Sequence, residues 1–177
     1  HGAVLLPGFI DLHTHGLHNF LVNNGPDDLV GLCKVMPKYG VTGFLAGAAP
    51  LGKGEDAILL KSLSQVKSEA AQMFGFHLEG PFLGLTGALS EEALKGENMQ
   101  RVKSLIEACK PYKAIFSIAP EFEGATDLIP VMAQNNTPVF ITHTCASVKQ
   151  TQAAIEAGAC HATHFYDVFP CPPVIDG

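Results

Sequence analysis

Short apolar runs alternate with longer amphipathic segments along the chain. Val, Ile and Phe dominate the short runs, and glycine, proline or polar residues follow each run. This alternation is typical of βα units arranged around a parallel sheet. The pattern predicts six strands, at Val4–His13, Val41–Ala46, Met73–Leu78, Ala114–Ile118, Val139–Thr142 and His161–His164.

Segments of helical period lie between these strands. The segment Ser147–Ala157 has the clearest limits, because Ser147 suits the N-cap position and Gly158 suits the C-cap. Its residues Val148, Thr151, Ala154 and Ile155 share one face of the helix. The pattern predicts five helices, at Asp27–Tyr39, Glu55–Gln72, Asn98–Cys109, Ala125–Asn135 and Ser147–Ala157.

The spacing of these units limits the architecture. A βα unit takes about 30 residues, and a closed eight-stranded barrel typically needs about 250 residues. The 177 residues therefore accommodate six units rather than eight. We expect an α/β fold that forms part of a TIM-type (β/α)8 barrel. Residues 1–177 would then be an incomplete catalytic domain without the last two strands.

Composition and charge exclude several classes of protein. The chain is 47% hydrophobic and 16% charged, which favours a buried core over disorder. Its 11 basic and 17 acidic residues give a net charge of −6, so no nucleic-acid partner is expected. No apolar run reaches the roughly 18 residues of a membrane span, so no membrane partner is expected either. Five scattered cysteines without C-x-x-C spacing favour reduced thiols and a cytoplasmic location.

Ionisable residues stand at the carboxyl ends of several predicted strands. His13 and His15 are two residues apart, so their side chains point to the same side of a strand. Glu79, His143 and His164 follow the third, fifth and sixth strands, and in a βα barrel such ends converge on one face. A carboxylate with two imidazoles is a ligand set typical of catalytic zinc. Such a metal suits hydrolysis of an amide or ester.

Five motifs together resemble a known family. They are PGFIDLHTHG (7–16), HLEGPF (77–82), APE (119–121), ITHT (141–144) and AIEAGACHATHF (154–165). In this combination the chain resembles the amidohydrolase superfamily, and specifically the N-acetylglucosamine-6-phosphate deacetylases. The resemblance extends over nearly all 177 residues.

The resemblance implies a metal, a reaction and roles for individual residues. Glu79, His143 and His164 would bind the principal divalent metal, zinc or iron, and His13 and His15 would correspond to ligands of a second ion. The implied reaction removes the acetyl group from N-acetylglucosamine 6-phosphate and releases glucosamine 6-phosphate and acetate. The general-base Asp of the family is expected beyond Gly177, so no catalytic base is expected within the chain. The family's accessory β-sandwich is also expected to be missing.

Other residues are assigned to the substrate or to support of the site. His18, Tyr166 and Asp167 are expected to contact the amino sugar, and Glu121 is expected to order the site from outside the ligand set. Family members commonly have N-A-M where this chain has Asp167 and the two residues after it. An aspartate would repel a phosphate, so an unphosphorylated N-acetyl sugar is an alternative substrate.

The sequence leaves two alternative functions open. One is another C–N hydrolase of the same superfamily, and the other is a catalytically incomplete fragment that binds metal or sugar. His77 is expected to support the site without binding metal, and Cys145 is expected to be small apolar filler. Unpaired strand edges favour a homodimer.

Overall fold

The computed structural model describes residues 4–96 and 99–170 of the chain. In these ranges six parallel strands form one sheet in the order β1-β4-β5-β6-β7-β8. Their bounds are β1 (Phe9–Thr14), β4 (Val41–Ala48), β5 (Gln72–Glu79), β6 (Lys113–Ile118), β7 (Val139–Ile141) and β8 (His161–Ala162). A small antiparallel hairpin, β2 (Gly16–Leu17) with β3 (Phe20–Leu21), follows β1.

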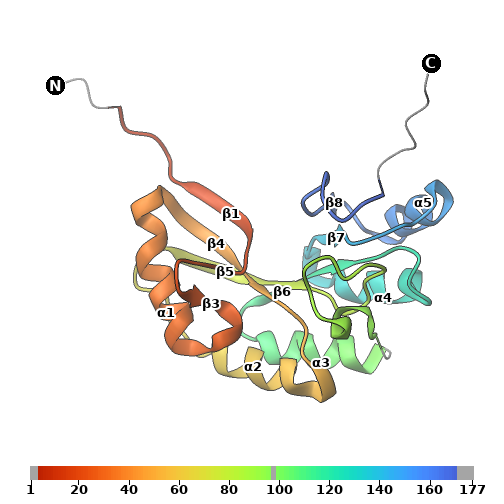
Figure 1. Ribbon diagram of the computed structural model, residues 1–177, viewed down its shortest axis with the longest axis horizontal. Coiled ribbons are helices and arrows are strands. Elements are labelled where there is room, and N and C mark those ends of the chain that lie inside the picture. The colour runs from red at the N-terminus through yellow and green to blue at the C-terminus, as the bar shows by residue number, and fades with distance from the viewer. Residues whose placement is uncertain (1–3, 97–98, 171–177) are drawn as a thin grey trace.

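Helices follow the strands and cover the outer face of the sheet. They are α1 (Pro26–Val35), α2 (Glu55–Leu63), α3 (Met99–Cys109), α4 (Ala125–Met132) and α5 (Val148–Ala157). Short 3₁₀ turns lie at Val22–Asn24, Met36–Tyr39, Gly52–Gly54, Glu91–Leu94 and Gln134–Asn136. Figure 1 shows α1, α2 and α3 on one side of the strands. Among the described helices, none has the length and apolar composition needed to cross a bilayer.

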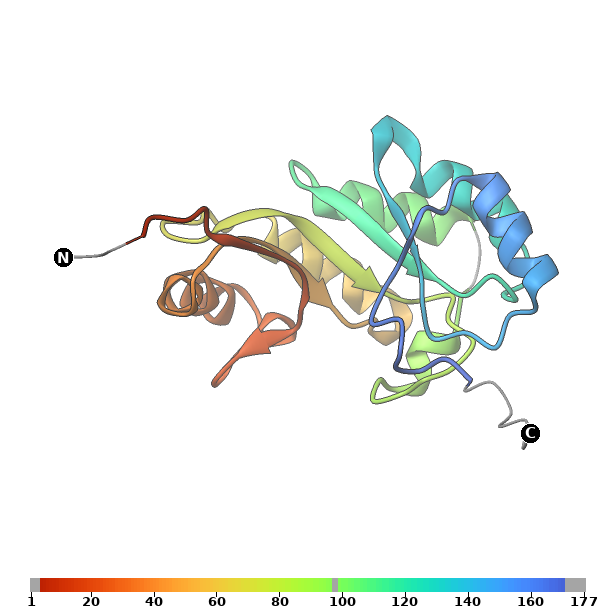
Figure 2. The same cartoon turned by 90° about the horizontal axis from the view of Figure 1, so that it is seen from above.

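The sheet curls into a half-barrel, as the sequence predicted. β1 and β8 are at opposite ends of the strand order, yet the rings of His13 in β1 and His164 just after β8 lie 5.5 Å apart. Only strong curvature can bring the two ends of the sheet so close. Figure 2 shows the twist of the same strands from above. The described structure is α/β, with the strand order of a partial TIM-type barrel.

The core lies between the sheet and the helices. Phe44, Phe76 and Phe116 are fully buried on three adjacent strands, β4, β5 and β6. They belong to the same apolar cluster as Leu60 of α2 and Leu105 of α3. Because side chains alternate along a strand, the neighbouring positions point to the concave face. A second, smaller cluster on that face consists of Leu45, Ile115 and Phe140.

Two predicted boundaries are wrong by five residues or more, and tertiary contacts explain both. The first strand begins at Phe9 rather than Val4, because its partner β4 begins at Val41 and pairs first with Phe9. The second helix ends at Leu63 rather than Gln72. The chain then follows an irregular path in which the Val66 carbonyl accepts a hydrogen bond from the Tyr112 hydroxyl at 2.8 Å. No local periodicity reveals such a distant partner.

The other elements agree with the prediction more closely. The helix predicted to begin at Asn98 is described from Met99 onward, and Asn98 itself lies outside the described residues. The first and fourth predicted helices each end in a 3₁₀ turn, Met36–Tyr39 and Gln134–Asn136. Helix α5 has the predicted Ser147 N-cap and Gly158 C-cap. The β2–β3 hairpin was not predicted, since two-residue strands carry too little pattern.

Candidate metal centre

Glu79 is the centre of a cluster of imidazoles at the carboxyl ends of the strands. The carboxylate is buried at the end of β5. The Nε2 atoms of His15 and His164 each lie 2.7 Å from a Glu79 oxygen, the Nε2 of His143 lies at 3.1 Å, and the Nε2 of His13 lies at 3.3 Å. The structure therefore brings together all five residues that the sequence assigned to metal binding.

The cluster collects residues from both ends of the curled sheet. His13 and His15 come from β1 and the turn after it, while His143 and His164 follow β7 and β8. Potential ligand atoms of His13, Glu79 and His164 all lie within 4.8 Å of one another. His13 thus lies as close to the carboxylate and His164 as a shared ion requires, although the resemblance assigned it to a second ion.

The histidines are oriented through their second ring nitrogen. His143 Nδ1 donates to the Leu85 carbonyl at 3.0 Å, and His164 Nδ1 donates to the Asp167 carbonyl at 3.1 Å. In a neutral imidazole this leaves a lone pair on Nε2, which here faces a carboxylate oxygen. A lone pair and a carboxylate oxygen so close repel unless a proton or a metal cation lies between them. The donor set therefore fits a divalent metal bound by imidazole nitrogens and a carboxylate.

The pKa of Glu79 agrees with a ligand role. Burial alone would raise the pKa of this carboxyl, but the imidazoles of His13, His143 and His15 lower it well below its usual range. Burial would likewise lower the pKa of His164, but Glu79 and the Asp167 carbonyl raise it above the ordinary value. Glu79 is therefore ionised across the physiological range.

Two of the candidate ligands have an unusual backbone conformation. His143 has φ 47° and His164 has φ 28°, both in the left-handed region that side-chain-bearing residues rarely adopt. Strain of this kind persists only where the surroundings impose it, and it is frequent at functional sites. At His143 the backbone amides of Gly84 and Leu85 both donate to its carbonyl oxygen at 2.9 Å. The loop after β5 thus holds the residue in place.

Glu121 contacts the loop that carries His143, and no contact to the cluster is described for it. Its carboxylate accepts the Cys145 backbone amide at 2.7 Å and also the Thr144 hydroxyl. A Cβ at Gly84 would collide with Glu121 Oε1, so a larger residue at this position would displace the carboxylate. This arrangement agrees with the supporting role expected of Glu121, and that role stays a prediction.

His77 is close to the cluster but does not point at Glu79. Its Nδ1 donates to the Leu12 carbonyl at 2.7 Å, and its Nε2 lies 2.6 Å from the Ser117 hydroxyl. Burial, together with the nearby His13, lowers the pKa of His77 to about 4. Because both ring nitrogens have partners, His77 is not available as a ligand in this conformation.

The three residues assigned to the substrate lie at the surface. His18 Nε2 lies 2.7 Å from the Tyr39 hydroxyl, on the side of the β2–β3 hairpin. Tyr166 is 98% exposed. Asp167 reaches the cluster through its backbone, because its carbonyl accepts from His164 and its amide donates to the His164 carbonyl at 2.8 Å. A substrate role for these residues stays a prediction.

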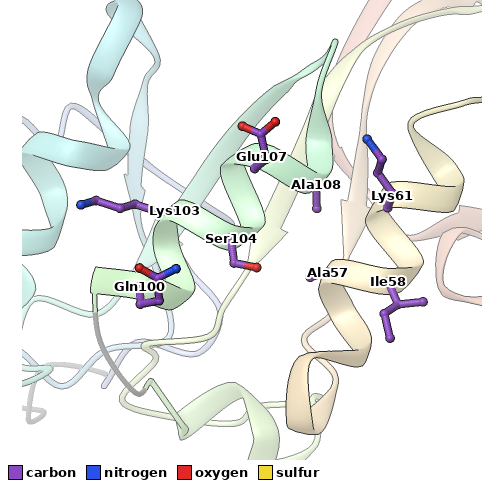
Figure 3. Close-up of a pocket in the computed structure, with 8 residues that line it drawn as sticks. All are labelled: Ala57, Ile58, Lys61, Gln100, Lys103, Ser104, Glu107 and Ala108. Carbon is purple, nitrogen blue, oxygen red and sulfur yellow. The ribbon is translucent and has the colours of Figure 1, made fainter.

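Sequence reasoning missed the backbone groups that orient the ligands. The carbonyls of Leu85 and Asp167 fix two imidazole rings, yet a carbonyl is the same in every residue and gives no sequence signal. A groove of about 700 Å³ lies elsewhere, between Lys61 of α2 and Lys103 of α3 (Figure 3). None of the candidate ligands lines this groove.

Comparisons with known proteins bear on this site. No protein-family model matches the chain. The chain is 31% identical over 170 residues to an N-acetylgalactosamine-6-phosphate deacetylase of Escherichia coli O157:H7, covering 93% of the chain and 45% of that protein. It is 28% identical over 174 residues to the N-acetylglucosamine-6-phosphate deacetylase of Bacillus subtilis, covering 93% of the chain and 44% of that protein.

The chain is also similar to solved structures of these deacetylases. An aspartate-to-alanine variant of the Mycobacterium smegmatis N-acetyl-D-glucosamine-6-phosphate deacetylase, in complex with N-acetyl-D-glucosamine-6-phosphate, matches with a TM-score of 0.84 at 26% identity. The match covers 96% of this chain and 45% of that one. The chain thus spans less than half the length of the relatives that it matches. The comparisons confirm the resemblance to these deacetylases that the motifs predicted.

Proposed function

We propose that the protein containing this chain is a metal-dependent deacetylase of N-acetylhexosamine 6-phosphates, and that this chain supplies its metal centre. One observation carries the proposal. A buried carboxylate, Glu79, faces the Nε2 atoms of His13, His15, His143 and His164. The relatives with deacetylase names match the chain over nearly its whole length.

Glu79, His143 and His164 would hold the principal ion, zinc or iron, with His13 close enough to join them. His15 is the remaining candidate, either for the same ion or for a second one. When bound, such an ion polarises the acetamide carbonyl and makes a water molecule acidic near neutral pH. An unactivated amide needs both effects, whereas a protein that only binds sugar needs neither.

The residues of this chain prepare the site for that ion. Glu79 stays ionised and provides negative charge. Leu85 and Asp167 hold the His143 and His164 rings with their Nε2 lone pairs toward the centre. Glu121 holds the loop after β7. The resemblance to the deacetylases implies that an Asp outside this chain would be the general base that moves protons between water and the leaving amine.

The proposed substrate is supported by the names of the relatives, and the alternative substrate by Asp167 of this chain. The names of the relatives include both hexosamine epimers, N-acetylgalactosamine and N-acetylglucosamine 6-phosphate. We take N-acetylglucosamine 6-phosphate as the primary substrate. The carboxylate of Asp167, beside His164, makes an unphosphorylated N-acetyl sugar the alternative.

Acetate release by the full-length protein tests this proposal. It would be measured with both hexosamine 6-phosphates and with unphosphorylated N-acetylglucosamine, at saturating zinc, with Glu79→Gln as the inactive control. Release from a phosphorylated sugar that Glu79→Gln abolishes would support the proposal. Preference for the neutral sugar would reject the phosphate assignment, and no release from any of the three would reject deacetylation.

A homodimer and a cytoplasmic location are further parts of the proposal. All four cysteines in the described part of the chain are free thiols, which suits a reducing compartment. In the isolated chain, the apolar side chains exposed along β1 favour association with a second copy.

A further inference from the structure

Three buried side chains form a hydrogen-bonded chain beside the metal centre. Thr163 Oγ1 lies 3.1 Å from Ser117 Oγ, which lies 2.6 Å from His77 Nε2. His77 Nδ1 in turn lies 2.7 Å from the carbonyl oxygen of Leu12. The side chains of Thr163, Ser117 and His77 are all buried. We call these three residues the cross-tie.

The carbonyl at one end determines the direction of the hydrogen bonds. Because a carbonyl oxygen only accepts, His77 Nδ1 must donate to Leu12, and in the neutral ring Nε2 then accepts. The Ser117 hydroxyl donates to Nε2, which leaves its oxygen to accept from the Thr163 hydroxyl. The hydrogen bonds of the cross-tie thus lead from Thr163 through Ser117 and His77 to Leu12, and Thr163 Oγ1 also lies 3.4 Å from His77 Nε2.

The cross-tie links the two edges of the sheet across its concave face. Leu12 belongs to β1 and Thr163 directly follows β8, which are the first and last strands in the sheet order. Ser117 of β6 reaches Thr163 past the intervening strand β7. The backbone ladder connects the same two edges only through five successive strand pairs.

Leu12, His77 and Thr163 each lie within two positions of a candidate ligand. Leu12 precedes His13, and Thr163 precedes His164. His77 is two positions before Glu79 and therefore on the same side of β5. These three neighbours, His13, Glu79 and His164, are the group whose ligand atoms lie within 4.8 Å of one another.

We propose that the cross-tie of Thr163, Ser117 and His77 sets the distance between the two sheet edges and thereby positions His13, Glu79 and His164 to bind one metal ion. The inference rests on the metal centre of the proposed function. A site must hold its ligands within about 0.5 Å of the productive geometry, and small changes in twist at each strand pair would otherwise accumulate. The three residues are positioning residues, since none of them touches the ion.

Two threonines provide a matched pair of variants. Thr163 and Thr142 are both buried, and each directly precedes a candidate ligand, His164 or His143. Thr163 Oγ1 is part of the cross-tie, whereas Thr142 Oγ1 has no hydrogen-bond partner in the described part of the chain. Replacement by valine removes the hydroxyl in either case and keeps the shape.

The experiment is a Co²⁺ titration of the metal-free full-length protein, followed by visible absorption. Thr163→Val and Ser117→Ala are expected to bind Co²⁺ about tenfold more weakly than the unmodified protein and to shift its absorption bands. Thr142→Val and Thr163→Ser are expected to match the unmodified protein. Equal binding by Thr163→Val and Thr142→Val would overturn the inference, and so would failure of Thr163→Ser to restore binding.

Ser117→Ala removes a single oxygen atom, and it is the second test variant if the Thr163→Val protein does not fold. Unchanged Co²⁺ affinity and absorption in a folded Ser117→Ala protein would overturn the inference. Absence of Co²⁺ binding by the unmodified protein would overturn both this inference and the proposed function. The expected pattern of Co²⁺ affinities without acetate release would reject deacetylation alone and support the cross-tie.

Discussion

Glu79 illustrates how neighbours determine the state of a single side chain. A buried carboxyl is ordinarily protonated at a higher pH than an exposed one, yet the imidazoles around Glu79 keep it ionised. The same carboxylate lies within 3.3 Å of imidazole nitrogens from β1 and from the segments after β7 and β8. Removal of its charge should therefore affect every ligand of the cluster together.

Glu79→Gln is expected to weaken metal binding strongly. The amide has the shape of the carboxylate but no negative charge, and its NH₂ group would face an imidazole lone pair or the ion. We expect affinity for Zn²⁺ to fall by more than the roughly 10- to 100-fold typical of outer partners. Isothermal titration of the metal-free protein checks this. Glu69→Gln, at an exposed glutamate, is the control, and equal Zn²⁺ affinity in both variants would contradict a ligand role for Glu79.

His77 is expected to make stability depend on pH. Its pKa is about 4 in the folded protein, below its ordinary value of 6.5. The unfolded chain therefore binds a proton first as the pH falls, so the stability present above pH 6.5 is lost toward pH 4. Through this residue, acidification from about pH 7.5 to about pH 5 should lower the free energy of unfolding by about 2 kcal/mol.

Urea unfolding of the metal-free protein at these two pH values measures that loss. His77→Gln should be less stable at neutral pH and should lose less of its stability on acidification. His161→Gln serves as the control, because His161 is an exposed histidine. If His77→Gln loses as much stability on acidification as the unmodified protein, His77 is not the source of the pH dependence.

Among the elements, α5 is the one whose boundaries follow most directly from local sequence. The Ser147 hydroxyl accepts from the Gln150 backbone amide, and the Gln150 side chain accepts from the Ser147 amide at 2.9 Å. This reciprocal pair is a capping box. At the other end the amide of Gly158, which has φ 123°, donates to carbonyls of the last turn. At both ends of α5, backbone polar groups therefore have hydrogen-bond partners within the helix or next to it.

Ser147→Ala is expected to destabilise the protein by about 1 kcal/mol, because the first turn loses the acceptor for its backbone amide. Urea unfolding at neutral pH measures the change. Ser62→Ala is the control, since Ser62 is an exposed serine of α2 whose hydroxyl donates to the Leu59 carbonyl within the helix. A loss at Ser147 no larger than the loss at Ser62 would contradict a capping role.

At the scale of the whole molecule, β1 exposes an apolar edge. Phe9, Ile10 and Leu12 are 73%, 58% and 49% exposed, although they belong to a strand of the sheet. β1 pairs with β4 on one side and has no strand partner on the other in the described structure. An unpaired edge with apolar side chains promotes association between copies.

The isolated 177-residue chain is therefore expected to self-associate and to be poorly active. Ile10→Lys should lower the average mass in sedimentation equilibrium, because a charged side chain on an edge strand opposes pairing. Ile58→Lys is the matched control, since Ile58 is 72% exposed on α2, away from this edge. A fully active monomer at all concentrations would contradict the prediction, as would equal effects of the two substitutions.

The sequence by itself determined the order of the strands and helices and the strand ends at which the ionisable residues lie. Period-2 and helical patterns depend on residues close together in the chain, so strands and helices could be predicted from them. In parallel βα units the strand ends share one face, so the sequence alone predicts that Glu79, His143 and His164 lie together. The H-x-H pair of His13 and His15 is also at a strand end, so the sequence predicts that it lies on the same face.

Only the tertiary structure decided how these residues are held. The carbonyls of Leu85 and Asp167 orient imidazoles, and a backbone atom has no identity in a sequence. Thr163 and His77, 86 positions apart, lie on one hydrogen-bonded chain. The grouping of His13 with His164 likewise depends on how tightly the sheet curls. Curvature is the sum of packing over many strands, and no local pattern contains it.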